Sequence, residues 1–277
     1  MNEIVCKKRL VSNIYEFVLN HKYIARKALP GQFVIIRTDE KGDRAPFTIC
    51  DTDPEKGTVT LVVMEVGRTS RKFIKMSEGD VLSTLVGPLG KPAEIAEKEK
   101  VLCIGGCYGI GGIYYYAKFL KEKDNYVITL LEGKEYNLLY WQDKIHSKSD
   151  ELYAVTREGR NGFKGHIPDG VNKIFQKHPD ISRVYSIGCT FMMMIVSLST
   201  KTFSAKTYVN LNPIMIDGTG MCGSCRVSVA GKTKFACIDG PDFDGHEIDW
   251  DNLLLRRKAY LKNELLSLRN ELQREDY

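Results

Sequence analysis

The amino-acid sequence predicts three folded parts: a small antiparallel β barrel, a doubly wound α/β domain, and a loop module rich in glycine and cysteine. Three observations support this prediction. First, short β segments separated by turn residues occupy the first 98 residues. Second, a buried strand, a glycine turn and a helical run follow one another from Lys100. Third, glycines and cysteines interrupt any periodic pattern after Pro213. A length of 277 residues is consistent with about two full domains.

The composition is that of a globular protein. Hydrophobic residues make up 43% of the chain and charged residues 27%, which is enough apolar material for a full core. The net charge of +5 is too small and too evenly spread for a nucleic-acid-binding surface. The first ten residues carry no secretory signal, and the apolar windows at 101–120 and 184–198 are interrupted by glycines or too short to cross a bilayer. We therefore expect a cytoplasmic protein that binds neither nucleic acid nor membranes.

Residues 1–98 are predicted to form the barrel. Apolar and polar residues alternate in short runs separated by turn residues, as expected for an antiparallel sheet with one buried face. The predicted strands lie at 14–19, 32–37, 47–50, 58–64 and 81–86.

Residues 99–210 are predicted to form the α/β domain. A glycine-rich turn joins the first strand to its helix, where backbone N–H groups and the helix dipole could receive a pyrophosphate; its glycines are Gly105, Gly106, Gly109 and Gly111. Glu132 follows the next strand, at about the distance at which an acidic residue binds a ribose hydroxyl in NAD-binding folds. A turn without a ligand and a solvated Glu132 remain equally open. The remaining strands are expected at 101–104, 126–131, 152–156 and 184–187, with helical runs at 113–121 and 171–177.

Residues 211–249 are predicted to hold metal. The spacing of one aspartate and three cysteines reproduces the plant-type ligand run of a [2Fe-2S] cluster, here Asp217, Cys222, Cys225 and Cys237. Glycines within the loop would let its backbone N–H groups approach the sulfides. A structural zinc site, built from the cysteines with Asp217 or His246, is the alternative, although a second C-x2-C pair is missing.

Residues 250–277 are predicted to form a C-terminal helix. Leucines lie on one helical face at 254, 261, 265, 268 and 272. Because a lone amphipathic helix is marginally stable in water, its apolar face must pack on something. Two interpretations are open: packing on this chain's own nucleotide domain, or docking on a partner subunit beside the cysteine loop.

The order of barrel, nucleotide domain and cysteine loop resembles the ferredoxin-NADP reductase superfamily. Within it the chain resembles dihydroorotate dehydrogenase electron-transfer subunits and, most closely, the small subunits of NADH-dependent reduced ferredoxin:NADP oxidoreductases, also called sulfide dehydrogenases. Segments 212–215 and 235–241 and the Asp217 loop carry the second resemblance, since an aspartate cluster ligand is known in that family. The resemblance implies FAD and a [2Fe-2S] cluster as cofactors and NAD(H) as substrate.

The resemblance also implies roles for individual residues. The segment from Arg44 to Thr48 resembles the superfamily's R-x-Y-S/T flavin motif, with the arginine one residue earlier. This likeness places Thr48 near the flavin N5 and Arg44 on the FAD pyrophosphate. Segment 188–193 stands where the family meets the nicotinamide, so Cys189 is expected to be catalytic together with Thr48, whereas its methionines could equally be core residues. The expected flavin-binding residues are Arg44, Pro46, Phe47, Thr48, Met64, Gly67, Thr69 and Ser70.

A flavin is needed between the other two redox groups, because a nicotinamide exchanges two electrons as hydride and an iron-sulfur cluster carries one. The resemblance further implies a larger iron-sulfur flavoprotein partner similar to the small subunit of glutamate synthase. In that complex electrons from NADPH are bifurcated toward ferredoxin and NAD, so ferredoxin would be reached only indirectly. Two alternatives are an electron-transfer subunit of dihydroorotate dehydrogenase, in which a four-cysteine cluster is usual, and a zinc-stapled binding module without redox activity.

Overall fold

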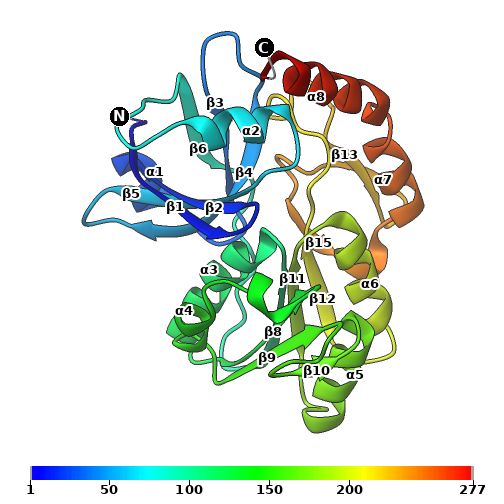
Figure 1. Cartoon of the computed structure of the whole chain (residues 1–277). Helices are drawn as coiled ribbons and strands as arrows, with labels where there is room; N and C mark the ends of the chain where they lie inside the picture. Colours follow the sequence, from blue (N-terminus) through cyan, green and yellow to red (C-terminus); the bar gives the residue numbers. More distant parts are fainter. Residues whose placement is uncertain (1, 276–277) are drawn as a thin grey trace.

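The computed structural model describes residues 2–275, with side chains described up to residue 270 (Figure 1). Its N-terminal part is one antiparallel sheet in the order β1-β2-β5-β4-β3-β6. The short helix α1 follows β2, and α2 follows β5. The bounds are β1 (Ile4–Val11), β2 (Ile14–Asn20), α1 (Lys22–Lys27), β3 (Phe33–Arg37), β4 (Ala45–Asp53), β5 (Thr58–Met64), α2 (Arg68–Lys75) and β6 (Thr84–Leu89).

The predicted barrel is not closed by a continuous ladder. Its two edge strands, β1 and β6, do not pair; instead an isolated bridge joins Glu3 to Val81, ahead of β6. The sequence-based strand at 81–86 therefore begins too early, because Val81 belongs to this bridge. Sequence analysis also misses β1, whose lysines and arginine interrupt the apolar alternation.

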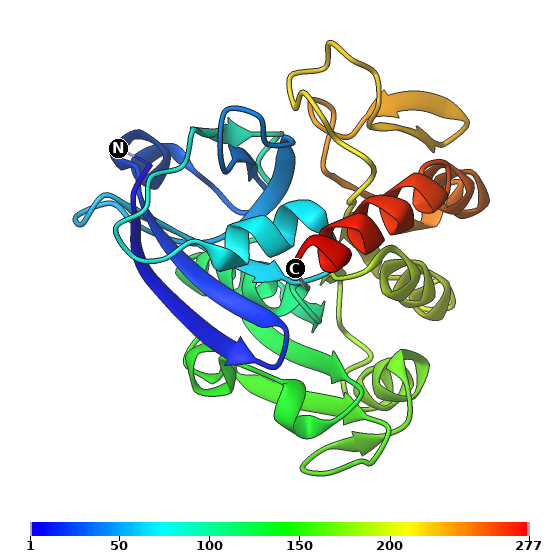
Figure 2. The same cartoon turned by 45° about the horizontal axis from the view of Figure 1, so that its top comes forward.

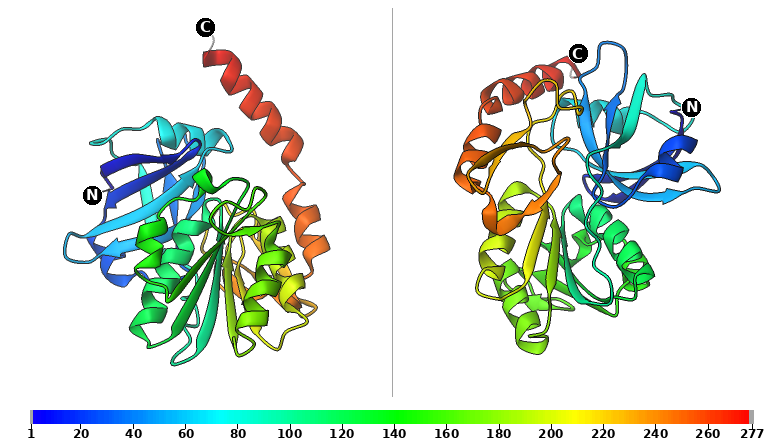
Figure 3. Two further views of the ribbon diagram at one scale, coloured as in Figure 1. Left: turned by 60° about the horizontal axis from the view of Figure 1, so that its bottom comes forward. Right: turned by 180° about the vertical axis from the view of Figure 1, so that it is seen from behind.

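The middle of the chain forms a seven-stranded sheet in the order β10-β9-β8-β7-β11-β12-β15, parallel except for β15. Helices α3 and α4 cover one face and α5 and α6 the other (Figures 1 and 3), which confirms the doubly wound prediction. The bounds are β7 (Lys100–Gly106), α3 (Gly109–Glu122), β8 (Tyr126–Gly133), η1 (Tyr136–Leu138), α4 (Gln142–His146), β9 (Glu151–Thr156), β10 (Phe163–Lys164), α5 (Ile167–Lys177), β11 (Arg183–Ile187), α6 (Thr190–Thr200) and β12 (Lys206–Asn210).

The cysteine-rich segment contains sheet structure that the sequence pattern does not predict. Strands β13 (Arg226–Val229) and β14 (Lys232–Phe235) form a hairpin. Its turn residues, Ala230 and Gly231, both have positive φ, as a two-residue hairpin turn requires. Further on, β15 (Asp242–Asp244) pairs antiparallel with β12, and η2 (Gly245–Glu247) follows it. The segment is thus joined to the nucleotide sheet as an edge strand.

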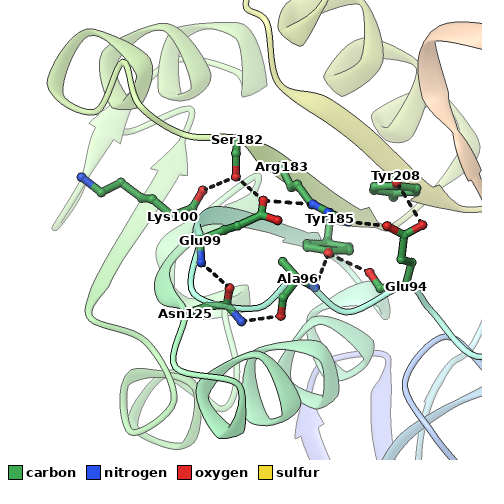
Figure 4. A network of polar contacts seen from close by, with 9 residues as sticks. All are labelled: Glu94, Ala96, Glu99, Lys100, Asn125, Ser182, Arg183, Tyr185 and Tyr208. Carbon is green, nitrogen blue, oxygen red and sulfur yellow. Dashed lines mark hydrogen bonds and ion pairs between the residues drawn. The ribbon is translucent and has the colours of Figure 1, made fainter.

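A polar network anchors the segment that links the two large sheets (Figure 4). The Tyr185 hydroxyl donates to the Glu94 carbonyl oxygen at 2.8 Å and accepts from the Ala96 N–H at 3.1 Å. The Arg183 guanidinium contacts the carboxylates of Glu94 and Glu99 at 2.6 and 3.0 Å. The linker is therefore held against β11 at several points.

A second polar cluster joins all three parts of the chain. The buried Tyr116 of α3 donates its hydroxyl to the carboxylate of Asp242 in β15 at 2.7 Å. The Asn210 amide donates to the same carboxylate at 2.6 Å and to the Gly31 carbonyl oxygen in the N-terminal part at 3.1 Å. Burial raises the pKa of Asp242.

We expect Tyr116→Phe to lower the free energy of unfolding by about 1–3 kcal/mol, because an inward-facing carboxylate loses a donor. Since the folded-state pKa of Asp242 is raised, the folded protein binds more protons than the unfolded chain, and this group's contribution to stability falls as pH rises through that range. The loss in Tyr116→Phe should thus be larger at neutral than at acidic pH. Denaturant titrations at both pH values test this, with exposed Tyr23→Phe as the control. Equal losses at the two pH values would contradict it.

The C-terminal stretch forms two helices and not the single predicted one: α7 (Trp250–Arg257) and α8 (Leu261–Glu275). The buried residue of α7 is Leu253, so the predicted leucine face is not continuous across the break. Helix α8 lies beside α2 (Figure 2), while the side chain of Leu272 lies outside the described residues. Within residues 2–275 no helix combines the length and apolar character needed to span a membrane.

Candidate functional site

A cavity of about 760 Å³ lies where the parts of the chain meet. Its volume is that of a site for a large organic cofactor. The N-terminal sheet contributes most of the predicted flavin-binding residues, namely Pro46, Phe47, Thr48, Met64, Gly67, Thr69 and Ser70. The other walls come from the nucleotide domain, the cysteine-rich segment and α8, including Tyr108, Ile187, Met215 and Leu265. The structure thus brings residues from the whole length of the chain to one cavity.

The N-terminus of α2 lies at this cavity. Gly67 precedes the helix, and the Ser70 hydroxyl accepts from the Gly67 N–H at 3.0 Å and donates back to its carbonyl oxygen at 2.9 Å. Ser70 therefore holds the turn in shape, while the first N–H groups of the helix form an anion-binding end. Arg68 also lines the cavity. Sequence analysis misses Arg68, although a basic residue beside a helix start is the available signal.

Arg44 does not line the cavity, although residues 43 and 45–48 do. Its guanidinium points instead to the cysteine-rich segment: Nε donates to the Ile216 carbonyl oxygen at 3.0 Å and Nη2 to that of Asp217 at 3.1 Å. The structure thus places Arg44 beside the predicted cluster loop.

The glycine turn of the nucleotide domain is set by close packing. A Cβ on Gly109 would lie 2.1 Å from the Ile187 carbonyl oxygen, and one on Gly111 would lie 2.6 Å from Val62 of β5. Gly105 and Gly106 end β7, and Gly106 pairs in register with Glu132 of β8. The turn and Glu132 therefore meet at the carboxyl edge of the sheet, where ligands bind in open α/β folds.

Two basic residues approach Glu132 from later strands and loops. Burial raises the pKa of Glu132, while the charges of Arg157 and His166 act in the opposite direction. Both bases are exposed, Arg157 directly after β9 and His166 before α5. Sequence analysis does not point to either base, because both are distant from Glu132 in the chain.

We expect wild type to prefer NADH over NADPH, because the Glu132 carboxylate would repel a 2′-phosphate. Glu132→Gln should weaken this preference about tenfold or more, because the neutral amide no longer repels a 2′-phosphate and its hydrogen bond with the ribose is no longer charge-assisted. The ratio of kcat/KM values for the two nucleotides in a diaphorase assay measures it. Glu135→Gln, on the adjoining exposed loop, is the control. An unchanged ratio in Glu132→Gln would remove Glu132 from the nucleotide site.

Cys189 is exposed at the start of α6, and its sulfur accepts from the Met192 N–H at 3.4 Å. The neighbouring methionines are buried: Met192 packs in the nucleotide-domain core and Met193 against the cysteine-rich segment. The core interpretation therefore fits the methionines. Tyr108 lies close by, donating its hydroxyl to the Gly188 carbonyl oxygen at 2.8 Å. Tyr108 is a cavity residue that sequence analysis does not single out.

The predicted cluster ligands lie in one loop and the hairpin that follows it. Cys225 and Cys237 are buried with their sulfurs 3.1 Å apart, whereas Cys222 is exposed. The Asp217 carboxylate accepts from the N–H groups of Thr219 and Met221 at 2.9 and 3.3 Å. Hydrogen bonds from Ser224 hold the pKa of Cys222 below its ordinary value, which favours the thiolate that binds metal.

Among the side chains of residues 2–270, no three from His, Cys, Asp or Glu surround a single point as ligands of one metal ion would. A [2Fe-2S] cluster divides four protein ligands between two irons, so it does not need three ligands at one point. Positive φ at Gly218, Gly220 and Gly223 gives the loop its tight curvature. The donor set and the loop fit such a cluster. His246 is directed elsewhere, with Nε2 3.1 Å from the Thr200 hydroxyl.

Comparison with known proteins decides the family. Residues 212–249 match the iron-sulfur cluster binding domain of dihydroorotate dehydrogenase B. A Thermotoga maritima protein described as a dihydroorotate dehydrogenase B (NAD(+)) electron transfer subunit homolog is 43% identical over 268 residues, covering 96% of this chain and 94% of that protein. The chain belongs to the family of these electron transfer subunits and their homologues.

Solved structures agree with this family and with the predicted fold. A chain from the structure of NADH-dependent reduced ferredoxin-NADP oxidoreductase, a study of flavin-based electron bifurcation, superimposes with a TM-score of 0.93 at 41% identity and 98% coverage of both chains. The ferredoxin reductase of carbazole 1,9a-dioxygenase, at 19% identity, superimposes with a TM-score of 0.63 over 73% of this chain and 65% of its own. The resemblance to the ferredoxin-NADP reductase superfamily is confirmed.

Proposed function

We propose that this chain is the flavin and [2Fe-2S] electron-transfer subunit of an oxidoreductase, exchanging electrons between NAD(H) and a larger iron-sulfur flavoprotein. The observation that carries the proposal is a cavity lined by residues from all parts of the chain. Flavin-motif residues form one wall, the edge of the nucleotide sheet another, and the segment leading to Asp217 a third. At such a junction the three redox groups would lie within reach of one another.

The residues of the cavity fit FAD. The N-terminus of α2, with Gly67 and Thr69, would hold the pyrophosphate together with the Arg68 guanidinium. Thr48 and Tyr108 would line the flavin ring on either side of the domain boundary. When bound, FAD supplies the conversion between hydride transfer and single-electron transfer. The chain contributes binding, orientation and exclusion of water.

NAD(H) would bind at the carboxyl edge of the nucleotide sheet. The N–H groups at the start of α3 would receive the pyrophosphate, and Glu132 would accept from a ribose hydroxyl. Cys189, exposed at the start of α6, would meet the nicotinamide. The [2Fe-2S] cluster would be held by the four predicted ligands, Asp217, Cys222, Cys225 and Cys237.

The surroundings of the loop support a partner protein. Ile216, Met221 and Ile238 are apolar yet 51%, 88% and 43% exposed, which is typical of a surface that is covered in a complex. We propose that this face meets the larger subunit, which resembles the small subunit of glutamate synthase, in a bifurcating ferredoxin:NADP oxidoreductase. The structural match to that enzyme supports this choice. None of the eight cysteines forms a disulfide, which fits a cytoplasmic location.

The proposal is tested on the purified chain. Its visible spectrum should combine flavin and [2Fe-2S] bands, iron and sulfide should each be present at about two per chain, and NADH should reduce the flavin. A colourless protein with zinc would overturn the proposal in favour of a zinc-stapled module, which the match to an iron-sulfur family already opposes.

A second candidate is the electron-transfer subunit of a dihydroorotate dehydrogenase, because the family match and the named relatives carry that description. The two candidates differ in the partner and not in the cofactors. Affinity purification of the chain from its own cells identifies the larger subunit. Dihydroorotate-dependent reduction of NAD by that complex would favour the second candidate, and reduced-ferredoxin-dependent reduction of NADP the first.

A further inference from the structure

Arg44 stands inside the flavin motif but contacts the cluster loop. It directly precedes β4, and the flanking residues line the flavin cavity while its own side chain does not. Its two hydrogen bonds, from Nε and Nη2, end on consecutive carbonyl oxygens of Ile216 and Asp217. A guanidinium is the side chain that can bind two neighbouring acceptors as a rigid fork.

The cluster loop rests on the same sheet. Gly218 has φ of +84°, and a Cβ there would lie 2.9 Å from Ile35 of β3 and 3.0 Å from Leu89 of β6. The loop backbone therefore packs directly on the flavin sheet at the residue after the aspartate. Arg44 adds the polar contact at the edge of this packing.

We propose that Arg44 is a positioning residue for the cluster: it fixes the Asp217 end of the loop to the flavin sheet and places a permanent positive charge beside the cluster. This inference rests on the proposed function. It differs from the superfamily pattern, in which the motif arginine binds the FAD pyrophosphate.

Two consequences follow from charge and geometry. A nearby cation stabilises the added electron of a reduced cluster, so Arg44 raises the cluster's reduction potential. A fork that holds two carbonyl oxygens slows opening of the loop and loss of iron. If Arg44 instead bound the FAD pyrophosphate, its replacement would change neither the cluster potential nor the rate of iron loss and would lower the affinity for FAD.

The test compares Arg44→Gln and Arg44→Lys with two arginine controls in the full-length chain. The first control is Arg26→Gln, because Arg26 is an exposed residue of α1 that is distant in sequence from the loop. The second control is Arg68→Gln, because Arg68 lines the proposed flavin cavity. This variant should lower the affinity for FAD without changing the cluster potential. The readouts are an EPR-monitored redox titration, the rate of cluster loss to a chelator, and FAD content.

We expect Arg44→Gln to lower the cluster's midpoint potential and to speed chelator-driven cluster loss by about tenfold, as for other outer-shell changes at metal sites. Arg44→Lys should keep most of the potential, because the charge remains, but should lose cluster faster than wild type, because the fork is gone. FAD content should match that of wild type in both.

Wild-type potential and cluster lifetime in both Arg44 variants would overturn the inference. Loss of FAD with an unchanged cluster would also overturn it and assign Arg44 to the pyrophosphate. Absence of both FAD and cluster from the wild-type chain would instead defeat the proposed function itself, so the two failures are distinguishable.

Discussion

Replacing Asp217 with alanine is expected to remove the [2Fe-2S] cluster, and this is the largest effect we predict. Loss of a direct ligand should exceed the roughly 10–100-fold loss of metal affinity that outer-shell changes cause. The neighbouring N–H groups that now donate to the Asp217 carboxylate would also lose their acceptor. Iron and sulfide analysis and the EPR spectrum of the reduced protein measure the outcome.

Asp217→Cys provides the complementary variant. It restores the common four-cysteine set, so the cluster should be retained with a changed potential. Asp251→Ala, an exposed aspartate on α7, controls for the loss of a surface carboxylate. If Asp217→Ala keeps the wild-type EPR spectrum and iron content, the aspartate is not a ligand and the fourth position must be sought elsewhere.

The second large effect is expected at α8. The sequence leaves open whether this helix docks on a partner or packs on the chain's own nucleotide domain. In the structure α8 lies instead beside α2 of the N-terminal part, and Leu261, Leu265 and Leu268 line the proposed flavin cavity. Removing residues 261–277 should uncover the cavity and release FAD. Because burying one leucine side chain contributes about 1.5–3 kcal/mol, FAD should bind at least about tenfold more weakly.

Two adjacent leucines give a matched point-mutant test. Leu265 and Leu266 are 58% and 56% exposed, but Leu265 lines the cavity and Leu266 does not. Leu265→Ser should raise the dissociation constant for FAD, measured by flavin fluorescence, while Leu266→Ser should leave it unchanged. If the truncated chain instead keeps its FAD and no longer assembles with the larger subunit, that result contradicts this prediction and supports docking of α8 on the partner.

Local patterns predict much of this fold. The boundaries of β5 and β8 agree closely with runs of β-branched and apolar residues. Patterns fail where the signal is not local. Strand β1 is not predicted because its charged residues interrupt the apolar alternation. The β13–β14 hairpin is not predicted because its turn contains Ala230, and alanine rarely adopts positive φ. The break between α7 and α8 likewise has no glycine or proline to mark it.

The sequence by itself determined the family, the order of the modules and the spacing of the predicted cluster ligands, because each of these is written in contiguous residues. Only the tertiary structure decided which residues the long side chains and the C-terminal helices contact. In the folded chain Arg44 donates to the predicted cluster loop and does not line the cavity. Arg157 lies near Glu132, and residues of α8 line the cavity. Such contacts join residues far apart in the chain, and they depend on how the sheets pack against one another, which no spacing pattern encodes.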